Sequence, residues 1–506
     1  MFQQITGERP ASSEDMAMGY TIYSDKILFT ATGGIGTFQD AINQAQTSQL
    51  PLMIAPGNYP TDDLVISASV EIYAMPGTVT LTPSSSSNGF NLDIRSDTFG
   101  AVISDVTIRG VSLWGAGKPF ASAVDTSQRY VYGLFAPMDN FNAIVTAQNV
   151  TRLIVEDCQI GGSGSNGLAM WNCTAEVRNN DFEGHFLHAI YAIDGWSTVI
   201  ADNFVRDGQN GGIYVARSAN GFDGTIIRGN RVHNTQATWN TTSGQVSGSG
   251  WLGNAIYCFQ AADVVIADNI CFNQTFSGIR LLDCWNCNIV GNQIYQSGET
   301  ALFVEAPNPP PQGTAGDANP LRYEGAVVAD NTIVNAGAGV VVGNGWNGGR
   351  RATISGNQIK SISVLTIRTN DPNYPSYLSW GTGIFAENDC MVSGNTVEDC
   401  ASAPGIALIS GGFANSTRKS ATSAVGNIVK ASQIGVGFFK EGPYGYTMIS
   451  GNMLEGYSNG AIVPVTVAAD FSLPRVAGST DYGTTSGGLY TGKPFANVMI
   501  GLNHAI

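Results

Sequence analysis

Positively charged residues are scarce in this chain of 506 residues, which has 24 Lys and Arg against 39 Asp and Glu, and only 4 His. The formal net charge of −15 argues against a nucleic-acid partner, because binding a phosphate backbone requires clustered Lys and Arg. The same charge disfavours a polyanionic substrate unless metal ions intervene. No apolar run is long enough to cross a bilayer, so we expect no membrane span. Charged residues are only 12% and hydrophobic residues 43%, a balance typical of a folded chain.

A positively charged, apolar leader is also missing from the start of the chain, so we expect that a signal peptide is absent or already removed. The eight cysteines form no zinc set, since Cys284 and Cys287 have CxxC spacing without a second CxxC or a His pair. We interpret the cysteines as small buried hydrophobic residues. A Cys390–Cys400 disulfide stays open as an alternative in an oxidising compartment.

A repeat dominates the chain, and it is marked by an Asn that follows a short apolar strand. The markers are Asn180, Asn203, Asn230, Asn269, Asn292, Asn331, Asn357, Asn395, Asn427 and Asn452, with Cys158 in the equivalent place. Their base period of about 23 residues, lengthened by loop-sized additions, is the signature of a solenoid. No repeat contains a helical pattern, and parallel strands wound this way are right-handed. The sequence therefore predicts an all-β fold, a single-stranded right-handed parallel β-helix in which each Asn points inward and stacks on the next.

The two ends of the chain depart from the repeat. Residues 37–45 place apolar side chains at helical spacing behind Thr37, a good N-cap, and indicate a capping helix over the open end of the stack. We divide the chain into an N-terminal arm at 1–34, the β-helix at 35–465, and an irregular C-terminal cap or docking tail at 466–506, where we expect the repeat to be lost.

Four stretches carry a resemblance to a known family: NGGIYVARSANGFDGTIIRGNRV at 210–232, GNAIYCF at 253–259, GETALFVEA at 298–306 and EGAVVADN at 324–331. The chain resembles the right-handed parallel β-helix superfamily of pectate-lyase-like proteins. More narrowly, residues 34–462 look like an alphaproteobacterial family of β-helix repeat proteins exported by the twin-arginine route. The resemblance implies a periplasmic or secreted location and a link to carbohydrates. The chain lacks the twin-Arg leader of that family and the YG-DPH motif of epimerases.

Five short segments between 188 and 305 align on one another, each with a small residue followed by a branched aliphatic one. The aliphatic residues are Ile190, Ile213, Ile256, Ile279 and Leu302, and strand alternation sends them to the core. The residues that follow them form a column on the opposite face, which we expect to stand in water: Tyr191, Tyr214, Tyr257, Arg280 and Phe303.

Further polar groups surround this outer column, namely His188, Asp194, Arg217 and Asn254. Aromatic faces pack on the apolar faces of sugars, and acids and amides bond hydroxyl groups. The column and these four residues are therefore the predicted binding site for a polysaccharide or oligosaccharide laid along the helix axis. Long additions at 233–253 and 360–381 are expected to wall off the coils between them.

Asp283, Glu305 and Glu299 are the candidate catalytic acids. Glycoside hydrolysis needs two carboxyl groups, about 5–5.5 Å apart for retention or about 6.5–9.5 Å for inversion. Asp283 and Glu305 lie on neighbouring coils, about 4.8 Å apart along the axis, so this whole range is within reach. Arg280 lies between them and could keep one acid ionised while the other retains a raised pKa. The sequence thus predicts a carbohydrate-active enzyme, a glycoside hydrolase ahead of a lyase.

Other interpretations stay open. A polysaccharide lyase would draw its base and its carboxylate neutraliser from Tyr191, Tyr257, His188, Arg217 and Arg280. A non-catalytic spike that binds glycan would use the same face and assemble as a trimer, and the polar groups could be only the solvated face of a solenoid. We predict no cofactor, with Ca²⁺ as an alternative beside three Asp residues that precede ladder Asn residues and that we otherwise interpret as turn residues: Asp202, Asp268 and Asp330.

Overall fold

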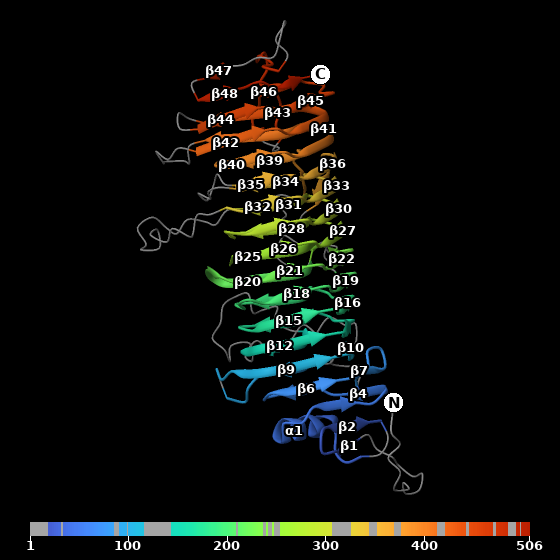
Figure 1. The fold of residues 1–506 in the computed structure, drawn as a ribbon. Coiled ribbons are helices and arrows are strands. Elements are labelled where there is room, and N and C mark those ends of the chain that lie inside the picture. Colours follow the sequence, from blue (N-terminus) through green and yellow to red (C-terminus); the bar gives the residue numbers. More distant parts are fainter. Residues whose placement is uncertain are drawn as a thin grey trace, which may run out of the picture.

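The computed structural model winds the chain into one elongated stack of parallel strands, with the N-terminal and C-terminal coils at opposite ends (Figure 1). It describes residues 19–31, 34–84, 91–98, 100–115, 143–208, 211–235, 239–240, 245–246, 253–305, 325–343, 352–368, 376–411, 420–441, 445–468, 472–483, 492–495 and 497–505. The strands of the β-helix fall into three stacks, which the chain visits in turn on each coil.

The strands of stack 1 belong to the 18-stranded sheet, which also includes the antiparallel strands β1 (Gly19–Ile22) and β47 (Gly492–Phe495), and from β15 on they carry the apolar runs before the ladder Asn residues. They are β2 (Ile27–Thr30), β3 (Leu52–Ile54), β6 (Val70–Tyr73), β9 (Ile103–Arg109), β12 (Val150–Glu156), β15 (Thr174–Arg178), β18 (Val199–Ala201), β21 (Ile226–Arg228), β26 (Val265–Ala267), β29 (Asn288–Val290), β32 (Val327–Ala329), β35 (Ala352–Ser355), β40 (Cys390–Ser393), β42 (Ser420–Val425), β44 (Gly445–Ser450) and β48 (Val498–Ile500).

Stacks 2 and 3 merge in the 27-stranded sheet. Stack 2, directly after the Asn turn, holds β4 (Gly57–Thr61), β7 (Val79–Pro83), β10 (Ser112–Trp114), β13 (Gln159–Gly161), β16 (Asp181–Glu183), β19 (Phe204–Arg206), β22 (Arg231–His233), β27 (Ile270–Gln274), β30 (Gln293–Ser297), β33 (Thr332–Ala336), β36 (Gln358–Ile362), β45 (Met453–Glu455) and β49 (His504–Ala505). Stack 3 holds β5 (Leu64–Ile66), β8 (Leu92–Ile94), β11 (Ala143–Gln148), β14 (Asn166–Trp171), β17 (His188–Ile193), β20 (Gly211–Phe222), β25 (Asn254–Ala262), β28 (Ser277–Leu282), β31 (Thr300–Glu305), β34 (Val340–Gly343), β39 (Ile384–Glu387) and β46 (Ile462–Pro464). Two long strands, β41 (Thr396–Gly411) and β43 (Ile428–Glu441), run through both stacks.

The predicted strand register is confirmed in stack 3. Ile190 pairs with Ile213, Ile213 with Ile256, Ile256 with Ile279, and Ile279 with Leu302, and all five side chains are buried in the core. Each coil thereby adds apolar side chains to one continuous interior that extends along the axis. The fold is the predicted all-β, parallel β-helix, and the described residues of its repeating coils form only strands and turns.

The Asn ladder is confirmed as an internal hydrogen-bonded row. Asn292 is typical: its side-chain amide nitrogen donates to Asn331 Oδ1 at 3.0 Å and to the Ile266 carbonyl at 2.9 Å. Its own Oδ1 accepts from the backbone N–H and the side-chain amide of Asn269, both at 3.0 Å. Asn292 is fully buried, so the ladder satisfies turn groups that water cannot reach.

The residue before each ladder Asn explains why the sequence alternates between Asp, Asn and Gly at that place. The backbone there is left-handed, with φ between 55° and 71°, at Asp157, Asn179, Asp202, Gly229, Asp268, Gly291, Asp330, Gly356, Gly394, Gly426 and Gly451. Gly adopts this conformation without steric cost, and Asp and Asn tolerate it better than other residues. This geometry accounts for Asp202, Asp268 and Asp330 as turn residues.

The N-terminal end is closed as predicted. Helix α1 (Phe38–Ser48) begins at Thr37, which forms a capping box with Asp40, and buries Phe38, Ala41, Ile42 and Ala45 against the first coils. The described part of the N-terminal arm adds β1 (Gly19–Ile22), which pairs antiparallel with β2. In the described part of the chain, α1 is the only helix, and its 11 residues are too few to cross a bilayer.

The C-terminal end differs from the prediction that the repeat is lost after residue 465. Strands β48 and β49 pair with β44 and β45, and Asn503 continues the ladder by accepting from Asn452 at 2.8 Å. The repeat returns after an interruption, and a search for a fixed period of about 23 residues does not find this last coil. The strand β47 (Gly492–Phe495) pairs antiparallel with β48 and borders this last coil.

All eight cysteines are buried and none forms a disulfide, so the suggested Cys390–Cys400 bond is absent. Burial raises the pKa of the Cys158 and Cys400 thiols to about 12, which leaves them protonated and unreactive at neutral pH. Cys284 and Cys287 lie in the core with the others, as the interpretation of small hydrophobic residues requires.

Candidate functional site

The outer column of stack 3 has the predicted register, but it does not stand in water. Tyr191 pairs with Tyr214, Tyr214 with Tyr257, Tyr257 with Arg280, and Arg280 with Phe303. Tyr191 is only 3% exposed and Arg280 only 5% exposed, while the other three are partly buried. The expectation of an exposed row is therefore wrong, because strand alternation tells which side a residue faces and not what covers that side.

The N-terminal half of the column is an aromatic stack. The rings of Tyr191 and Tyr214 lie 5.1 Å apart and nearly parallel, and His188 stacks on both at 5.5 and 5.0 Å. Tyr257 continues the row at 4.9 Å from Tyr214 with a tilt of 46°. Burial lowers the pKa of His188 to about 4, so its imidazole is neutral at pH 7. His188 and Tyr191 therefore stabilise the column by ring packing and are not placed to transfer a proton.

The centre of the column is a buried ion pair. Arg280 Nη1 lies 2.6 Å from Glu299 Oε2, with both side chains less than a tenth exposed. The hydroxyl of Ser277 donates to the same carboxylate oxygen at 3.2 Å. Arg280 also lies over two rings, with its guanidinium carbon 4.7 Å from the centroid of Phe276 and 4.2 Å from that of Phe303. Glu299, predicted as a catalytic acid, is thus placed as the counter-ion of Arg280.

The C-terminal edge of the column brings together three more groups. Burial raises the pKa of Glu305, Asp283 raises it further by repulsion, and the positive charge of Arg280 partly opposes both. Burial also raises the pKa of Tyr257 above its usual range; the positive charge of Arg280 opposes that rise, and Cys284, Glu305 and Asp283 add to it. Because electrostatic influence weakens with distance, Tyr257, Arg280, Asp283 and Glu305 lie in one neighbourhood.

Asp283 occupies a turn position as well as a place in this group. Its backbone is left-handed, with φ of 53°, and the same conformation recurs on other coils at Asp194 and Gln260. Turn geometry therefore explains in part why a polar residue stands at this position. It does not explain why that residue is Asp, because an Asn would adopt the left-handed backbone equally well.

The remaining predicted binding residues are engaged in local structure. Asp194 accepts hydrogen bonds from Trp171 Nε1 at 3.3 Å and from the Ser218 backbone at 2.7 Å. Arg217 donates to the Gly195 carbonyl at 2.7 Å. Asn254, at the first position of β25, is buried. Asp194 and Arg217 thus bond to groups of stack 3 on the earlier coils. Asn254 lies on β25, the strand that pairs with β28 of the Arg280 coil.

Sequence reasoning missed two features beside Glu305. Phe276 forms the second ring against Arg280, and its place just before β28 gave no period-2 signal. Glu387, the last residue of β39, lies in the strand position two coils beyond Glu305, with Gly343 of β34 between them. The expected loop wall at 233–253 lies largely outside the described residues, and the one at 360–381 is described except for 369–375. The described part of the second one includes a hairpin of β37 (Thr366–Arg368) and β38 (Ser376–Leu378).

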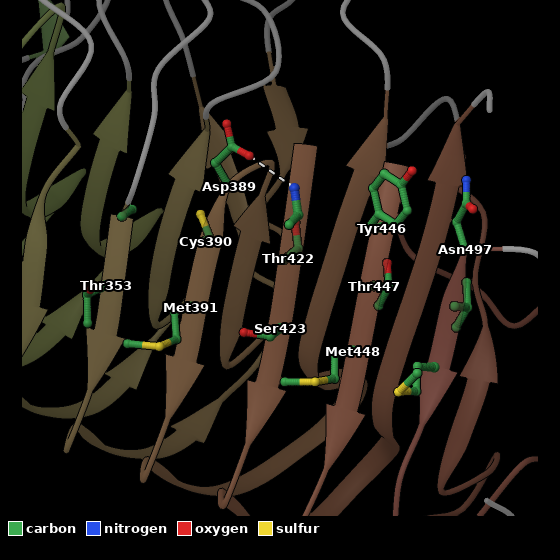
Figure 2. A pocket seen from close by; sticks show the side chains of 14 residues that line it. Thr353, Asp389, Cys390, Met391, Thr422, Ser423, Tyr446, Thr447, Met448 and Asn497 are labelled. Atoms are coloured by element: carbon green, nitrogen blue, oxygen red, sulfur yellow. Dashed lines mark hydrogen bonds between the residues drawn. The ribbon is translucent and has the colours of Figure 1, made fainter. Parts of the chain in front are cut away.

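A described pocket lies elsewhere, on the outer face of stack 1 over the last coils (Figure 2). It has a volume of about 650 Å³, and its floor is a column of paired strand positions: Thr353, Met391, Ser423, Met448 and Met499. Its carboxylate, Asp389, accepts a hydrogen bond from the Ala421 backbone at 3.0 Å. Among the described residues that line this pocket, Asp389 is the one acid, whereas glycoside hydrolysis needs two.

No group of three or more His, Cys, Asp or Glu side chains that could hold a metal ion occurs among the residues the structure describes. The suggestion of Ca²⁺ therefore stays a prediction without a described ligand set.

Comparisons with known proteins agree with the fold. A family model described as right handed beta helix region matches residues 94–249, and no curated protein sequence matches the chain. A mutant of the periplasmic alginate epimerase AlgG is similar at 12% identity, with a TM-score of 0.42 over 95% of this chain and 85% of that chain. The A-module of the mannuronan C-5 epimerase AlgE6 from Azotobacter vinelandii is 16% identical, with a TM-score of 0.40 over 84% of this chain and 94% of that chain.

A third similar structure is the catalytic unit of an α-1,3-glucanase from Streptomyces thermodiastaticus, at 12% identity and a TM-score of 0.40 over 82% of this chain and 65% of that chain. The narrower resemblance to an exported alphaproteobacterial family stays a prediction. With its three stacks of parallel strands, its internal Asn ladder and the matching family model, the chain is a right-handed parallel β-helix protein.

Proposed function

We propose that this protein is a carbohydrate-active enzyme that hydrolyses a glycosidic bond at the outer edge of stack 3, with Glu305 and Asp283 as the paired carboxyl groups. The observation that carries the proposal is the placement of these two acids on neighbouring coils, at the ends of the paired strands β28 and β31. Glu305 is partly buried and has a raised pKa, to which burial and the nearby Asp283 contribute. An acid with a raised pKa beside a second carboxyl group is the arrangement that glycoside hydrolysis uses.

In this mechanism Glu305, as the protonated acid, donates its proton to the glycosidic oxygen while the bond to the sugar carbon breaks. The carboxylate of Asp283 either attacks that carbon or takes a proton from the water that does. The acids lie on neighbouring coils, about 4.8 Å apart along the axis, a spacing that admits both routes. Arg280 is a positioning residue, since its charge limits how far the pKa of Glu305 rises and its side chain is fixed by Glu299.

A lyase is less well supported. Elimination next to a uronate needs a base and a cation that neutralises the substrate carboxylate. Burial raises the pKa of Tyr214 and Tyr257, which makes each a poor base near neutral pH. The pKa of His188 is lowered to about 4, and Arg280 already faces the carboxylate of Glu299.

A glycan-binding spike that acts as a trimer is the non-catalytic alternative. A periplasmic or extracellular location belongs to the same proposal, because it rests on the family resemblance and on a polymeric sugar substrate. The mass of the native protein in solution separates the two functions: a monomer that releases sugar contradicts the spike, and a trimer without turnover contradicts the enzyme.

The direct test is a product screen on neutral and acidic polysaccharides with the parent protein, Glu305→Gln and Asp283→Asn. A matched control is Glu71→Gln, which removes an exposed carboxylate from β6 in stack 1. We expect the parent and the control to release reducing sugar and the two site variants to lose it with their circular dichroism unchanged. Full activity in both site variants would refute the assignment, and an unsaturated uronate product would establish a lyase instead.

A further inference from the structure

Two large aromatic side chains stand exposed at the turn that leads from stack 3 to stack 1. Phe222, at the end of β20, is 62% exposed, and Trp196, shortly after β17, is 52% exposed. Among the residues that the structure describes, no other Phe, Tyr or Trp side chain is as exposed as these two. Single apolar residues are common on protein surfaces, but two rings at the same turn of consecutive coils form a patch that core packing does not explain.

The two aromatic residues lie side by side. Ser197 follows Trp196 in the chain, and Asp223 follows Phe222. The backbone N–H of Ser197 donates to the carbonyl of Asp223 at 2.7 Å, which ties the two turns together. Since β17 pairs with β20, about 4.8 Å along the axis separates one turn from the next.

A buried ion pair holds this turn in place. The guanidinium group of Arg217 donates to the carbonyl of Gly195 at 2.7 Å and lies 3.7 Å from the carboxylate of Asp223. Asp223 is only 1% exposed. Gly195 directly precedes Trp196, and Asp223 directly follows Phe222, so Arg217 links the backbones that carry the two rings. A surface that is already ordered loses little conformational freedom when it binds a ligand.

An irregularity in β20 precedes the exposed ring of Phe222. The four residues 217–220 stand opposite the single residue Gln260 of β25. Extra residues in one strand of a pair bend that strand and change the direction of nearby side chains, and such bulges are over-represented next to active sites. The position of Phe222 therefore departs from the regular coil.

The patch continues toward the proposed site along the same edge of stack 3. Phe222 pairs with Ala262, and Ala262 forms a bridge to Trp285 on the next coil. Trp285 comes two residues after Asp283, one of the two proposed catalytic acids. Phe222 and Trp196 therefore lie two and three coil steps from the coil of Asp283, about 9.6 and 14.4 Å along the axis.

From this arrangement we infer that Trp196 and Phe222 form a remote subsite for a polysaccharide, whose sugar rings pack their C–H faces on the two side chains. A chain that extends from Asp283 along the axis toward the N-terminal coils passes over both rings, and this continuity favours a sugar chain over a protein partner. The inference rests on the proposed hydrolysis and adds the class of substrate. That substrate is a polymer several sugar units long, since a single sugar unit at Asp283 does not reach the rings.

Binding, measured apart from turnover, tests this. All proteins carry Asp283→Asn so that the polymers stay intact, and affinity gel electrophoresis measures Kd for dextran, barley β-glucan, xylan, galactomannan, alginate and polygalacturonate. The site variants are Trp196→Ala, Phe222→Ala and the double variant. The matched control, Phe272→Ala, removes a 39% exposed ring from β27 in stack 2. Circular dichroism verifies that each variant is folded.

We expect at least one polysaccharide to bind, and each single site variant to weaken that binding about fivefold or more. The double variant should weaken it further, and Phe272→Ala should leave it unchanged. Equal Kd values in the double variant and its Asp283→Asn parent, or no binding of any of the six polymers, would overturn the inference.

The native mass of the double variant addresses the other occupant that an exposed aromatic patch could have. Unchanged sugar binding together with a fall in mass would assign the rings to a contact between two copies of the chain, and would also overturn the inference. Binding that depends on the rings, in a parent protein that releases no sugar, would refute only the hydrolysis. The two failures are therefore distinguishable.

Discussion

The ion pair between Arg280 and Glu299 allows a structural role for Glu299 to be separated from a catalytic one. Glu299→Gln keeps an oxygen for Arg280 Nη1 and the Ser277 hydroxyl but removes the negative charge. The guanidinium is then left buried between Phe276 and Phe303 without its counter-ion. Breaking a buried ion pair by removing one partner costs about 3–5 kcal/mol.

That cost converts into a measurable melting shift. An unfolding entropy of about 2.1 cal/mol/K per residue gives roughly 1 kcal/mol per kelvin for a chain of this size, so Tm should fall by about 3–5 °C. Arg280→Met should cause a similar loss, because it removes the cation that faces the buried carboxylate of Glu299. The double variant, which removes both charges, should melt above either single variant. Thermal melts followed by circular dichroism at pH 7 give all four values.

Activity completes the comparison. Because Glu299 is occupied by Arg280, Glu299→Gln should retain most of its sugar release at a temperature well below its Tm. A Glu299→Gln variant that melts like the parent protein and has lost turnover would show that Glu299 acts on the substrate. Equal Tm values for the single and double variants would show that Arg280 and Glu299 do not stabilise each other, and would refute the expected cost of breaking the pair.

Three further predictions concern Glu305, the ladder and the aromatic stack. Because the pKa of Glu305 is raised in the folded protein, ionisation of Glu305 opposes folding, and this destabilisation grows as pH rises through the pKa of the unfolded and then of the folded state. Glu305→Gln should therefore raise Tm at pH 7 and lose that advantage below about pH 4. Thermal melts at a series of pH values measure this. By the same shift, turnover should fall as pH rises through the pKa of Glu305, whereas a rate that climbs steadily to pH 9 would contradict its role as the acid. Asn292→Ala removes hydrogen bonds to three neighbouring residues in the interior and should lower the free energy of unfolding by about 3–5 kcal/mol. Its control, Asn288→Ala at the exposed start of β29, should change Tm by less than about 1 °C. Tyr214→Leu should lower Tm without changing sugar release at a temperature well below its Tm, since the ring packs between His188 and Tyr257. A large loss of turnover at that temperature would place the stack in the substrate site.

The fold was predictable because its two determining signals are local. Period-2 alternation assigned Ile256 and Tyr257 to opposite faces, and the recurring Asn gave the register from one coil to the next. The interruption before Asn503 hid the last coil, because its partner Asn452 lies 51 residues away in sequence, about twice the usual spacing.

The site was harder to predict because burial of its outer face depends on contacts that alternation does not encode. Arg280 is distinguished in the sequence only as a charged residue among aromatic ones, and its enclosure by Phe276 and Phe303 becomes evident only in three dimensions. Glu299 lies in a turn before its strand, so its pairing with Arg280 could not be derived from strand register.

The Asn ladder also has a direction. From Asn180 to Asn503 each side-chain amide donates to the next oxygen at 2.8–3.0 Å, ten links in the same sense, and the backbone N–H that each oxygen also accepts fixes which atom is which. Aligned amide groups polarise one another, so their dipoles add along the axis with the positive end toward the C-terminal coil. The β-helix is therefore electrically polar through its interior, and an approaching strand meets a different hydrogen-bonding face at each end of the row.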